Sequence, residues 1–181
     1  IDARKKNDIL LTFTARAGLR AGEEAERALL GKLARARAEK GVKLVDEKPF
    51  LFPEPVGHVP DRRVVVVGAG CAGLFCALSL ARAGLRPLLV ERGDDATRRG
   101  EVVYAHNATG VLDPESNIQF GVGGAGTFSD GKLQTGTKSP AHRLILQEFV
   151  DAGAQPQILW DAKPHVGSDV LPGVVTNILR Q

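Results

Sequence analysis

The stretch from Arg63 to Glu91 constrains the fold most, because it joins two apolar runs through a glycine-rich turn and a helical pattern. Val64 to Val67 are four consecutive β-branched residues, which are typical of a strand buried on both faces. The turn that follows has the spacing G-x-G-x-x-G. Residues 74–83 then predict an apolar helix ended by Gly84, and residues 85–90 predict a second strand. This order predicts one βαβ unit of the dinucleotide-binding type.

Each glycine of the turn has a mechanical role in such a unit. Gly68 lets the chain turn sharply off the strand, and Gly73 lets the helix lie close to it. Gly70 has no Cβ, so a pyrophosphate can approach the backbone there. The helix would then direct its positive dipole end and the free N–H groups near Cys71 and Ala72 at the phosphates.

Glu91 ends the second apolar run, close to the spacing of about 20 residues at which this motif carries an acidic residue. Its carboxylate could accept hydrogen bonds from ribose hydroxyls and would repel a 2′-phosphate, which favours an unphosphorylated ribose. Two other readings are a glycine turn in an ordinary parallel sheet and a membrane span, since residues 64–81 contain no charge. Three glycines at the motif spacing and the matching second strand favour nucleotide binding.

A second glycine-rich segment, from Gln119 to Leu133, holds five glycines between Gly121 and Gly131. Ordering such a segment is entropically costly, so a flexible linker is one reading. The other is a cofactor contact, because glycines let successive N–H groups line a concave surface, and nearby hydroxyls and a lysine add polar groups. The candidate contacts are Gly123, Gly124, Ala125, Gly126, Thr127, Ser129 and Lys132.

Between these two segments, residues 92–109 are polar. This stretch contains three arginines that could bind phosphates, Arg92, Arg98 and Arg99. The alternative is that at least one of them lies on the solvated surface. We count Arg92 among the candidate cofactor contacts. Residues 113–116 predict a turn.

The N-terminal part predicts a small α+β unit. Residues 9–14 alternate like a half-buried strand, residues 23–40 predict a helix that ends at Gly41, and residues 42–45 predict another strand. A proline-rich connector follows, so we place one domain at residues 1–60 and the nucleotide-binding domain at residues 61–181.

The C-terminal part predicts helices over residues 140–153 and 170–180, with a loop at residues 163–169 between them. This loop contains His165, but a lone histidine is usually structural. The four histidines are not at metal-ligand spacings, so we expect no metal, and no residue is identified as catalytic.

Composition excludes some classes of function. The chain has 181 residues and a net charge of +3, with no basic stripe interleaved with aromatic residues, so no nucleic-acid partner is indicated.

Cys71 and Cys76 fall on one helix with their thiols pointing apart, which favours small core residues over a redox pair. No signal peptide is visible, which predicts a cytoplasmic protein. The chain begins with Ile1 and has no methionine, so we expect its N-terminus to be missing or processed.

Several motifs together resemble the bacterial FAD-dependent dehydrogenases that are mostly uncharacterised: VVVVGAGCAGLF, VERG at residues 90–93, TGVLDPESNIQFGVGGAGTFSDGKL at residues 109–133, and AKPHVGSD at residues 162–169. The resemblance covers about residues 61–181, and DARKK at residues 2–6 is also similar to the preceding region of that family. One departure is Cys71, where the family usually has proline.

This resemblance implies a Rossmann-like FAD/NAD(P)-binding domain of the three-layer ββα type, present only in part, with a small ferredoxin-like unit before it. It also implies that the remaining strands and the substrate region would lie beyond Gln181. The function implied is an FAD-dependent oxidoreductase, with NAD(P)H as a possible electron donor and an unknown small-molecule substrate. An NAD-dependent dehydrogenase is the alternative enzyme, since the βαβ unit alone does not separate the two cofactors. A non-catalytic nucleotide-binding or RNA-modification accessory module is the alternative from another class.

Overall fold

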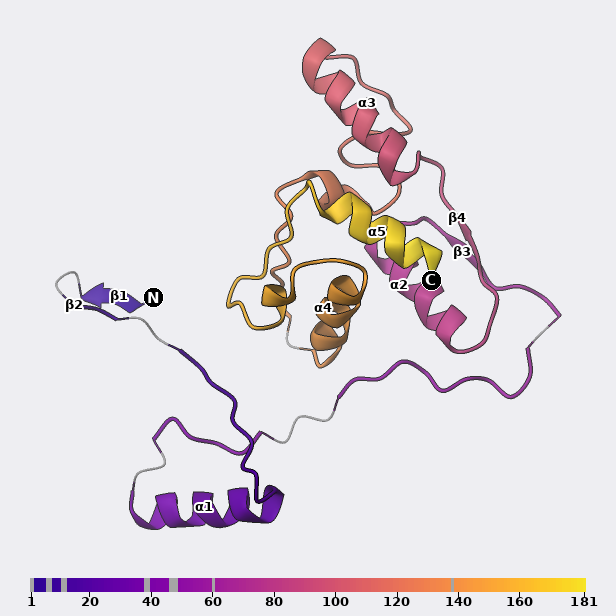
Figure 1. Cartoon of the computed structure of the whole chain (residues 1–181). Coiled ribbons are helices and arrows are strands. Elements are labelled where there is room, and N and C mark those ends of the chain that lie inside the picture. The colour runs from indigo at the N-terminus through magenta and orange to yellow at the C-terminus, as the bar shows by residue number, and fades with distance from the viewer. Residues whose placement is uncertain are drawn as a thin grey trace. The chain divides into compact units, whose positions relative to one another are not determined.

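The structure is a computed structural model that describes residues 2–5, 8–10, 13–37, 40–45, 49–59, 61–137 and 139–181 (Figure 1). Contacts divide the chain into two units, Ile1–Glu47 and Lys48–Gln181. The connector residues Phe52 and Val56 belong to the second unit: Phe52 packs against its core, and the Val56 N–H donates to the Ala83 carbonyl at 2.8 Å.

The first unit holds an antiparallel hairpin, β1 (Asp2–Lys5) and β2 (Asp8–Leu10), and the helix α1 (Glu23–Arg35). The expected strand at residues 42–45 is absent, and the helix ends before residue 40 because Arg37 adopts a left-handed conformation with φ 50°. The expected strand at residues 9–14 is present only as far as Leu10, and residues 11, 12, 38 and 39 lie outside the described residues. A ferredoxin-like topology is not confirmed and stays a prediction.

The second unit begins with the predicted βαβ motif. β3 (Val65–Val67) and β4 (Leu88–Val90) are parallel neighbours in register, with Val66 opposite Leu89. Helix α2 (Cys71–Arg82) connects them and is followed by Gly84 at φ 80°, as the sequence predicts.

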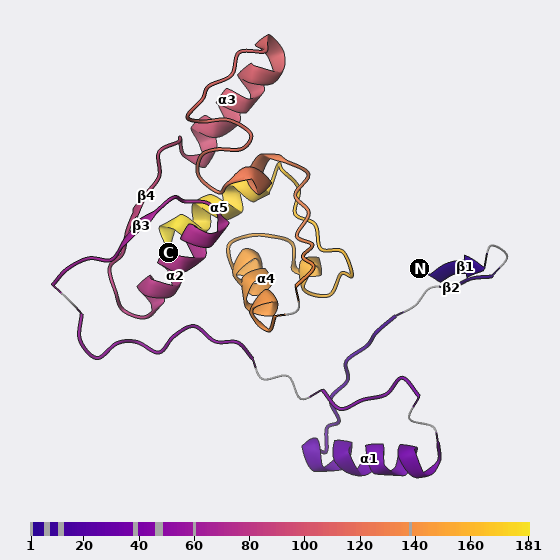
Figure 2. The ribbon, with the colours of Figure 1, turned by 180° about the vertical axis from the view of Figure 1, so that it is seen from behind.

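The prediction that the first strand is buried on both faces is wrong. Val66 and Leu89 point inward and are half-buried, whereas Val65 and Val67 are 54% and 84% exposed. The inward face packs on α2, and in both views the helices of this unit lie to one side of the sheet (Figure 1 and Figure 2). In a sheet covered on one face only, alternate side chains of a strand remain exposed.

The polar stretch at residues 92–109 forms a helix, α3 (Ala96–Thr109), that the sequence reading did not predict. The Asp95 carboxylate caps its first turn by accepting from the N–H groups of Thr97 and Arg98 at 2.8 and 2.9 Å. Gly110 ends the helix at φ 75°. Figure 1 and Figure 2 show α3 extending away from the other helices of this unit.

The main core lies between α2, α4 (Ala141–Asp151) and α5 (Leu171–Arg180), with the short 3₁₀ helix η2 (Pro156–Leu159) at its edge. Both α-helices were predicted from the sequence, over residues 140–153 and 170–180, and both are present. Their buried residues include Phe149, Val174 and Ile178, which meet Leu78 of α2. A smaller cluster of Ala69, Leu74, Val122 and Val175 lies directly under the glycine turn that follows β3.

Two further expectations concern α2. Cys71 and Cys76 are free thiols, but both are exposed, so the prediction that they are core residues is wrong. Among the helices of the described segments, none combines the length and the apolar character needed to cross a bilayer.

A buried carboxylate on α4 gives a testable pH dependence. Glu148 is 2% exposed and accepts from Arg82 Nη2 at 2.6 Å. Burial raises the pKa of Glu148, with a further contribution from Asp151, and the opposing effect of Arg82 is smaller. A raised carboxyl pKa in the folded chain means that ionising Glu148 costs stability, so this contribution falls as pH rises above the ordinary value of about 4.3.

We therefore expect the free energy of unfolding of wild type to decline over that pH range relative to that of Glu148→Gln. Urea unfolding at several pH values would measure the difference, with Glu101→Gln, a change at an exposed carboxylate, as the control. Identical pH profiles for wild type and Glu148→Gln would contradict this assignment.

Candidate functional site

The turn between β3 and α2 has the geometry that its glycines predict. Gly68 has φ 95°, a conformation that favours glycine. A Cβ on Gly73 would overlap the Gly68 carbonyl oxygen, so only glycine lets α2 start this close to the strand. Gly70 has open space where a Cβ would stand and provides no side-chain cap. The first N–H groups of α2, at Cys71 and Ala72, therefore lack an intrahelical acceptor and are free to bind an anion.

Glu91 holds this turn through backbone hydrogen bonds. Its Oε2 accepts from the Ala69 N–H at 2.6 Å, and its Oε1 accepts from the Gly93 N–H at 2.9 Å. Burial opposes ionisation, but hydrogen bonds from the backbone of Gly93, Ala69 and Arg92, together with the charge of Arg99, lower the pKa of Glu91. The ionised carboxylate thus fixes the start of the turn, a role that the sequence reading did not predict, and it retains lone pairs for a ribose hydroxyl.

The second glycine-rich segment lies against the first turn, so the structure brings the two predicted loops together. The Gly123 N–H donates to the Ala69 carbonyl at 2.7 Å. A Cβ on Gly124 would lie 3.4 Å from the Gly70 Cα and 3.7 Å from the Cys71 nitrogen. Gly123 and Gly124 have φ 91° and 72°, so both positions favour glycine for conformational reasons as well.

Other predicted contacts of this segment differ in their surroundings. Ala125 and Gly126 start the 3₁₀ helix η1 (Ala125–Phe128) and are exposed, whereas Thr127 is buried with its hydroxyl next to Gly123. The Ser129 hydroxyl donates to the Gly126 carbonyl at 3.3 Å. Lys132 is exposed and pairs with Asp130 at 2.6 Å.

The three arginines that could have met phosphates have other partners. Arg92 pairs with Glu115 at 2.6 Å and Arg98 with Glu101 at 2.7 Å, and all four side chains are exposed. Arg99 is fully buried and donates to backbone carbonyls between Asn117 and Gly124, so its guanidinium is occupied by the protein and is not exposed to a ligand. The sequence reading missed its role; the cap residues Asp95 and Gly110 were the signal that could have revealed helix α3 and hence its buried side.

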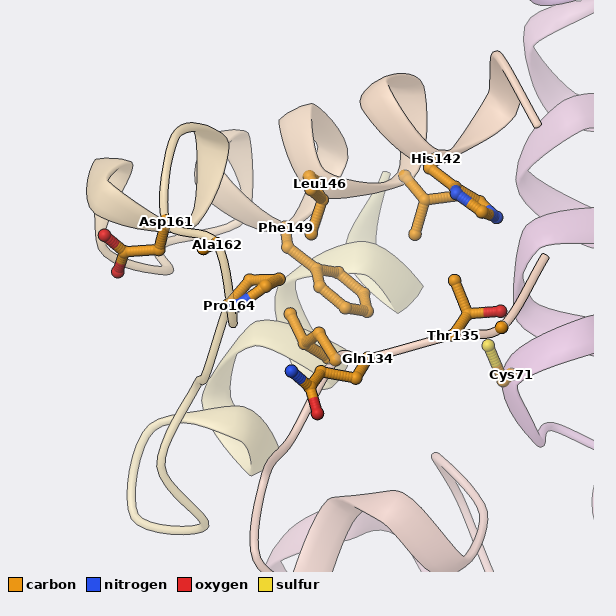
Figure 3. Close-up of a pocket in the computed structure, with 12 residues that line it drawn as sticks. Cys71, Gln134, Thr135, His142, Leu146, Phe149, Asp161, Ala162 and Pro164 are labelled. Carbon is orange, nitrogen blue, oxygen red and sulfur yellow. The ribbon is translucent and has the colours of Figure 1, made fainter. Parts of the chain in front are cut away.

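A cavity of about 930 Å³ begins at the N-terminus of α2. Figure 3 shows the Cys71 sulfur near Thr135 on one side, with His142 and Leu146 of α4 opposite and the Phe149 ring between them. The remaining lining residues are Leu133, Gln134, Gly136, Ile145, Asp161, Ala162 and Pro164. The lining is therefore mostly apolar, with hydrogen-bonding groups at a few points, as is usual for sites that bind organic cofactors.

Two residues near the cavity limit its chemistry. Burial of the sulfur raises the pKa of Cys71 although the residue as a whole is exposed, so the thiol stays protonated at neutral pH. His165 hydrogen-bonds through Nε2 to the Asp130 carbonyl at 2.6 Å, and its backbone forms a bridge with Lys132. His165 thus has a structural partner that joins the 163–169 loop to the second glycine-rich segment.

The site combines a phosphate-sized backbone cradle with an adjoining apolar cavity, and comparison with known proteins gives it a context. Residues 63–116 match the family described as FAD dependent oxidoreductase. An uncharacterized protein from Clostridium beijerinckii is 42% identical over 181 residues, which is 100% of this chain and 32% of the relative. The chain thus spans about a third of the length of that relative.

Two shorter matches involve proteins with assigned names. A probable electron transfer flavoprotein-quinone oxidoreductase from Escherichia coli is 47% identical over 51 residues, covering 26% of this chain and 12% of the relative. The tRNA 5-methylaminomethyl-2-thiouridine biosynthesis bifunctional protein MnmC from Stutzerimonas stutzeri is 36% identical over 81 residues, covering 45% and 12%.

The two hydrogen bonds of Glu91 predict an effect on stability that does not depend on any ligand. In Glu91→Gln, the amide NH₂ would face one of the two N–H groups that the carboxylate now satisfies. We expect the free energy of unfolding to fall by about 1.5–3 kcal/mol, the range for hydrogen bonds to charged groups. Chemical denaturation without cofactor would measure it.

The matched control for this change is Glu101→Gln, which removes one partner of an exposed ion pair on α3. It should change stability by less than about 1 kcal/mol. If Glu91→Gln were no less stable than this control, the carboxylate would not hold the turn.

Proposed function

We propose that this chain, whose residues 63–116 belong to the FAD-dependent oxidoreductase family, binds FAD in a flavin-dependent oxidoreductase. The observation that carries the proposal is the contact between the two glycine-rich loops at the open N-terminus of α2. There, the Gly123 N–H donates to Ala69, and Gly124 faces Gly70 and Cys71 without a side chain. The result is a surface of backbone groups at a helix dipole, which suits a pyrophosphate.

The residues present fit the cofactor in three parts. The adenosine would lie along the ends of β3 and β4, where Glu91 retains lone pairs for a ribose hydroxyl. The pyrophosphate would accept from the N–H groups of Cys71 and Ala72. The flavin half would enter the apolar cavity that begins at Cys71. Arg92, Ser129 and Lys132 keep a place as candidate contacts at the exposed rim.

When bound, the flavin supplies the electron or hydride transfer, and this chain binds it, orients it and limits access of water. The apolar lining from α4 and the segments around residues 133 and 164 would exclude water from one side of the ring. NAD(P)H as electron donor and a cytoplasmic location remain part of the proposal. The substrate is a small molecule whose class these residues do not define.

The direct test is a titration of the cofactor-free full-length protein with FAD and, separately, with NAD. Tight binding of FAD with weak binding of NAD is the expected result. Preferential binding of NAD would instead favour the dehydrogenase alternative, and binding of neither dinucleotide would contradict the proposal.

Gly124→Ala tests the cradle itself. The added methyl group fits without a clash but would lie 3.7 Å from the Cys71 nitrogen, on the surface where the pyrophosphate would bind. Loss of one charge-assisted hydrogen bond, worth about 1.5–3 kcal/mol, would weaken FAD binding by about tenfold to a hundredfold. Fluorescence titration with FAD would measure the dissociation constant.

Gly22→Ala is the matched control for this change. Gly22 has nearly the same backbone conformation, φ 82° and ψ −177° against φ 72° and ψ −172° for Gly124, and open space around it, but it lies before α1 in the first unit. Both variants place alanine in a backbone region that is essentially restricted to glycine, at a cost of about 1–3 kcal/mol. Equal FAD affinity for the two variants would show that Gly124 is not part of the cofactor site.

A further inference from the structure

Arg99 of α3 is a buried charge that binds backbone. Its side chain is 0% exposed. Nε donates to the Asn117 carbonyl at 2.8 Å, and Nη2 donates to the Ile118 carbonyl at 3.0 Å. Nη1 donates to the carbonyls of Val122 and Gly124, both at 2.8 Å, and more weakly to Gly121 at 3.4 Å. The guanidinium thus gathers carbonyl groups from a segment that runs into the second glycine-rich loop.

The residues around Arg99 leave room for an arginine side chain and little else. A Cβ on Gly121 would lie 2.8 Å from Arg99 Cδ, so the loop passes too close for any other residue. The Phe128 ring lies 5.0 Å from the guanidinium carbon and covers it from η1. Burial lowers the pKa of Arg99, and the charge of Glu91 opposes that effect, but an arginine stays ionised in either case.

The same loop segment is fixed from its other side by its own N–H groups. The Val122 N–H donates to the Asp94 carbonyl at 3.1 Å, and the Gly123 N–H donates to the Ala69 carbonyl at 2.7 Å. Arg99 therefore donates hydrogen bonds to the carbonyl groups of Val122 and Gly124, the residues on either side of Gly123. Their partial negative charges are directed at a cation and are neutralised there.

We infer that Arg99 is a positioning residue for the cofactor site. By holding the carbonyls of Val122 and Gly124, it sets Gly124 opposite Gly70 and keeps carbonyl oxygens from facing the pyrophosphate. Arg99 touches no ligand itself, and its effect on affinity is exerted through the loop. This inference rests on the proposed function, because it assigns the loop geometry to FAD binding.

The variant that tests it is Arg99→Lys, which keeps the positive charge but cannot reach carbonyls on several sides with one ammonium group. Arg98→Lys is the matched control, because Arg98 is the exposed neighbour that pairs with Glu101. FAD dissociation constants would be measured on the cofactor-free full-length protein, at a temperature where circular dichroism shows every variant to be folded. The visible circular dichroism of bound flavin would be recorded at saturating FAD.

We expect Arg99→Lys to bind FAD about tenfold or more weakly, as for loss of one or two charge-assisted hydrogen bonds, and to alter the visible circular dichroism. A role in stability alone would lower the melting temperature and leave both readouts unchanged in the folded protein. Wild-type affinity and spectrum in Arg99→Lys would overturn the inference. Failure of the wild-type protein to bind FAD would instead overturn the proposed function.

Hydrogen exchange on the wild-type protein decides the matter if Arg99→Lys does not fold. The amides of Val122, Gly123 and Gly124 should exchange slowly before FAD is added, because Arg99 holds the loop in the conformation in which these N–H groups donate to Asp94, Ala69 and Gly121. Fast exchange that becomes slow only with FAD would show that the cofactor orders the loop, and the inference would be wrong.

Discussion

The hydrogen bonds that Glu91 and Arg99 make to the backbone are the interactions on which the site depends. The surfaces that would meet a cofactor consist of glycine-rich backbone, which has few side chains to anchor it and a high entropic cost of ordering. Glu91 binds N–H groups at the start of the first turn, and Arg99 binds carbonyl groups of the second loop. Hydrogen bonds to charged groups are stronger than those between neutral groups. One anionic and one cationic side chain therefore fix the backbone of the two loops.

The supporting groups leave the N–H groups at the start of α2 open. Arg99 is buried behind the second loop, and Glu91 holds the first turn through the N–H groups of Ala69 and Gly93 while it retains lone pairs for a ribose hydroxyl. The hydrogen bond from Gly123 to Ala69 joins the two supported loops into one surface. The cavity next to it is mostly apolar and contains a protonated thiol and few charged groups. Such a division suits a cofactor with a charged diphosphate and a planar organic ring that carries out its own chemistry.

The local parts of this arrangement could be predicted from the sequence, because they depend on residues close together in the chain. The glycine spacing predicted the turn at residues 68–73, and apolar spacing predicted α2, α4 and α5. The exposed positions of Val65 and Val67 could not be predicted, because the covering of a strand depends on elements distant in sequence. The buried position of the Arg99 side chain could not be predicted for the same reason. Its partners lie 18 to 25 residues further along the chain, and a charged residue in a polar stretch predicts solvent exposure.

For Glu91, the position at the end of the second strand predicted a role at a nucleotide site, and that role stays a prediction. The structure places its carboxylate beside the glycine turn that follows β3. Its bonds to Ala69 and Gly93 could not be read from the spacing, because they depend on how the turn after β3 folds back on β4.

Whether this backbone surface binds FAD is decided by identifying what the full-length protein carries when it is purified under native conditions. The protein would be denatured, and the released small molecule analysed by absorbance and mass. We expect a flavin spectrum and the mass of FAD, at close to one molecule per chain. A protein that carries no flavin, and takes up none when FAD is added in excess, would contradict it.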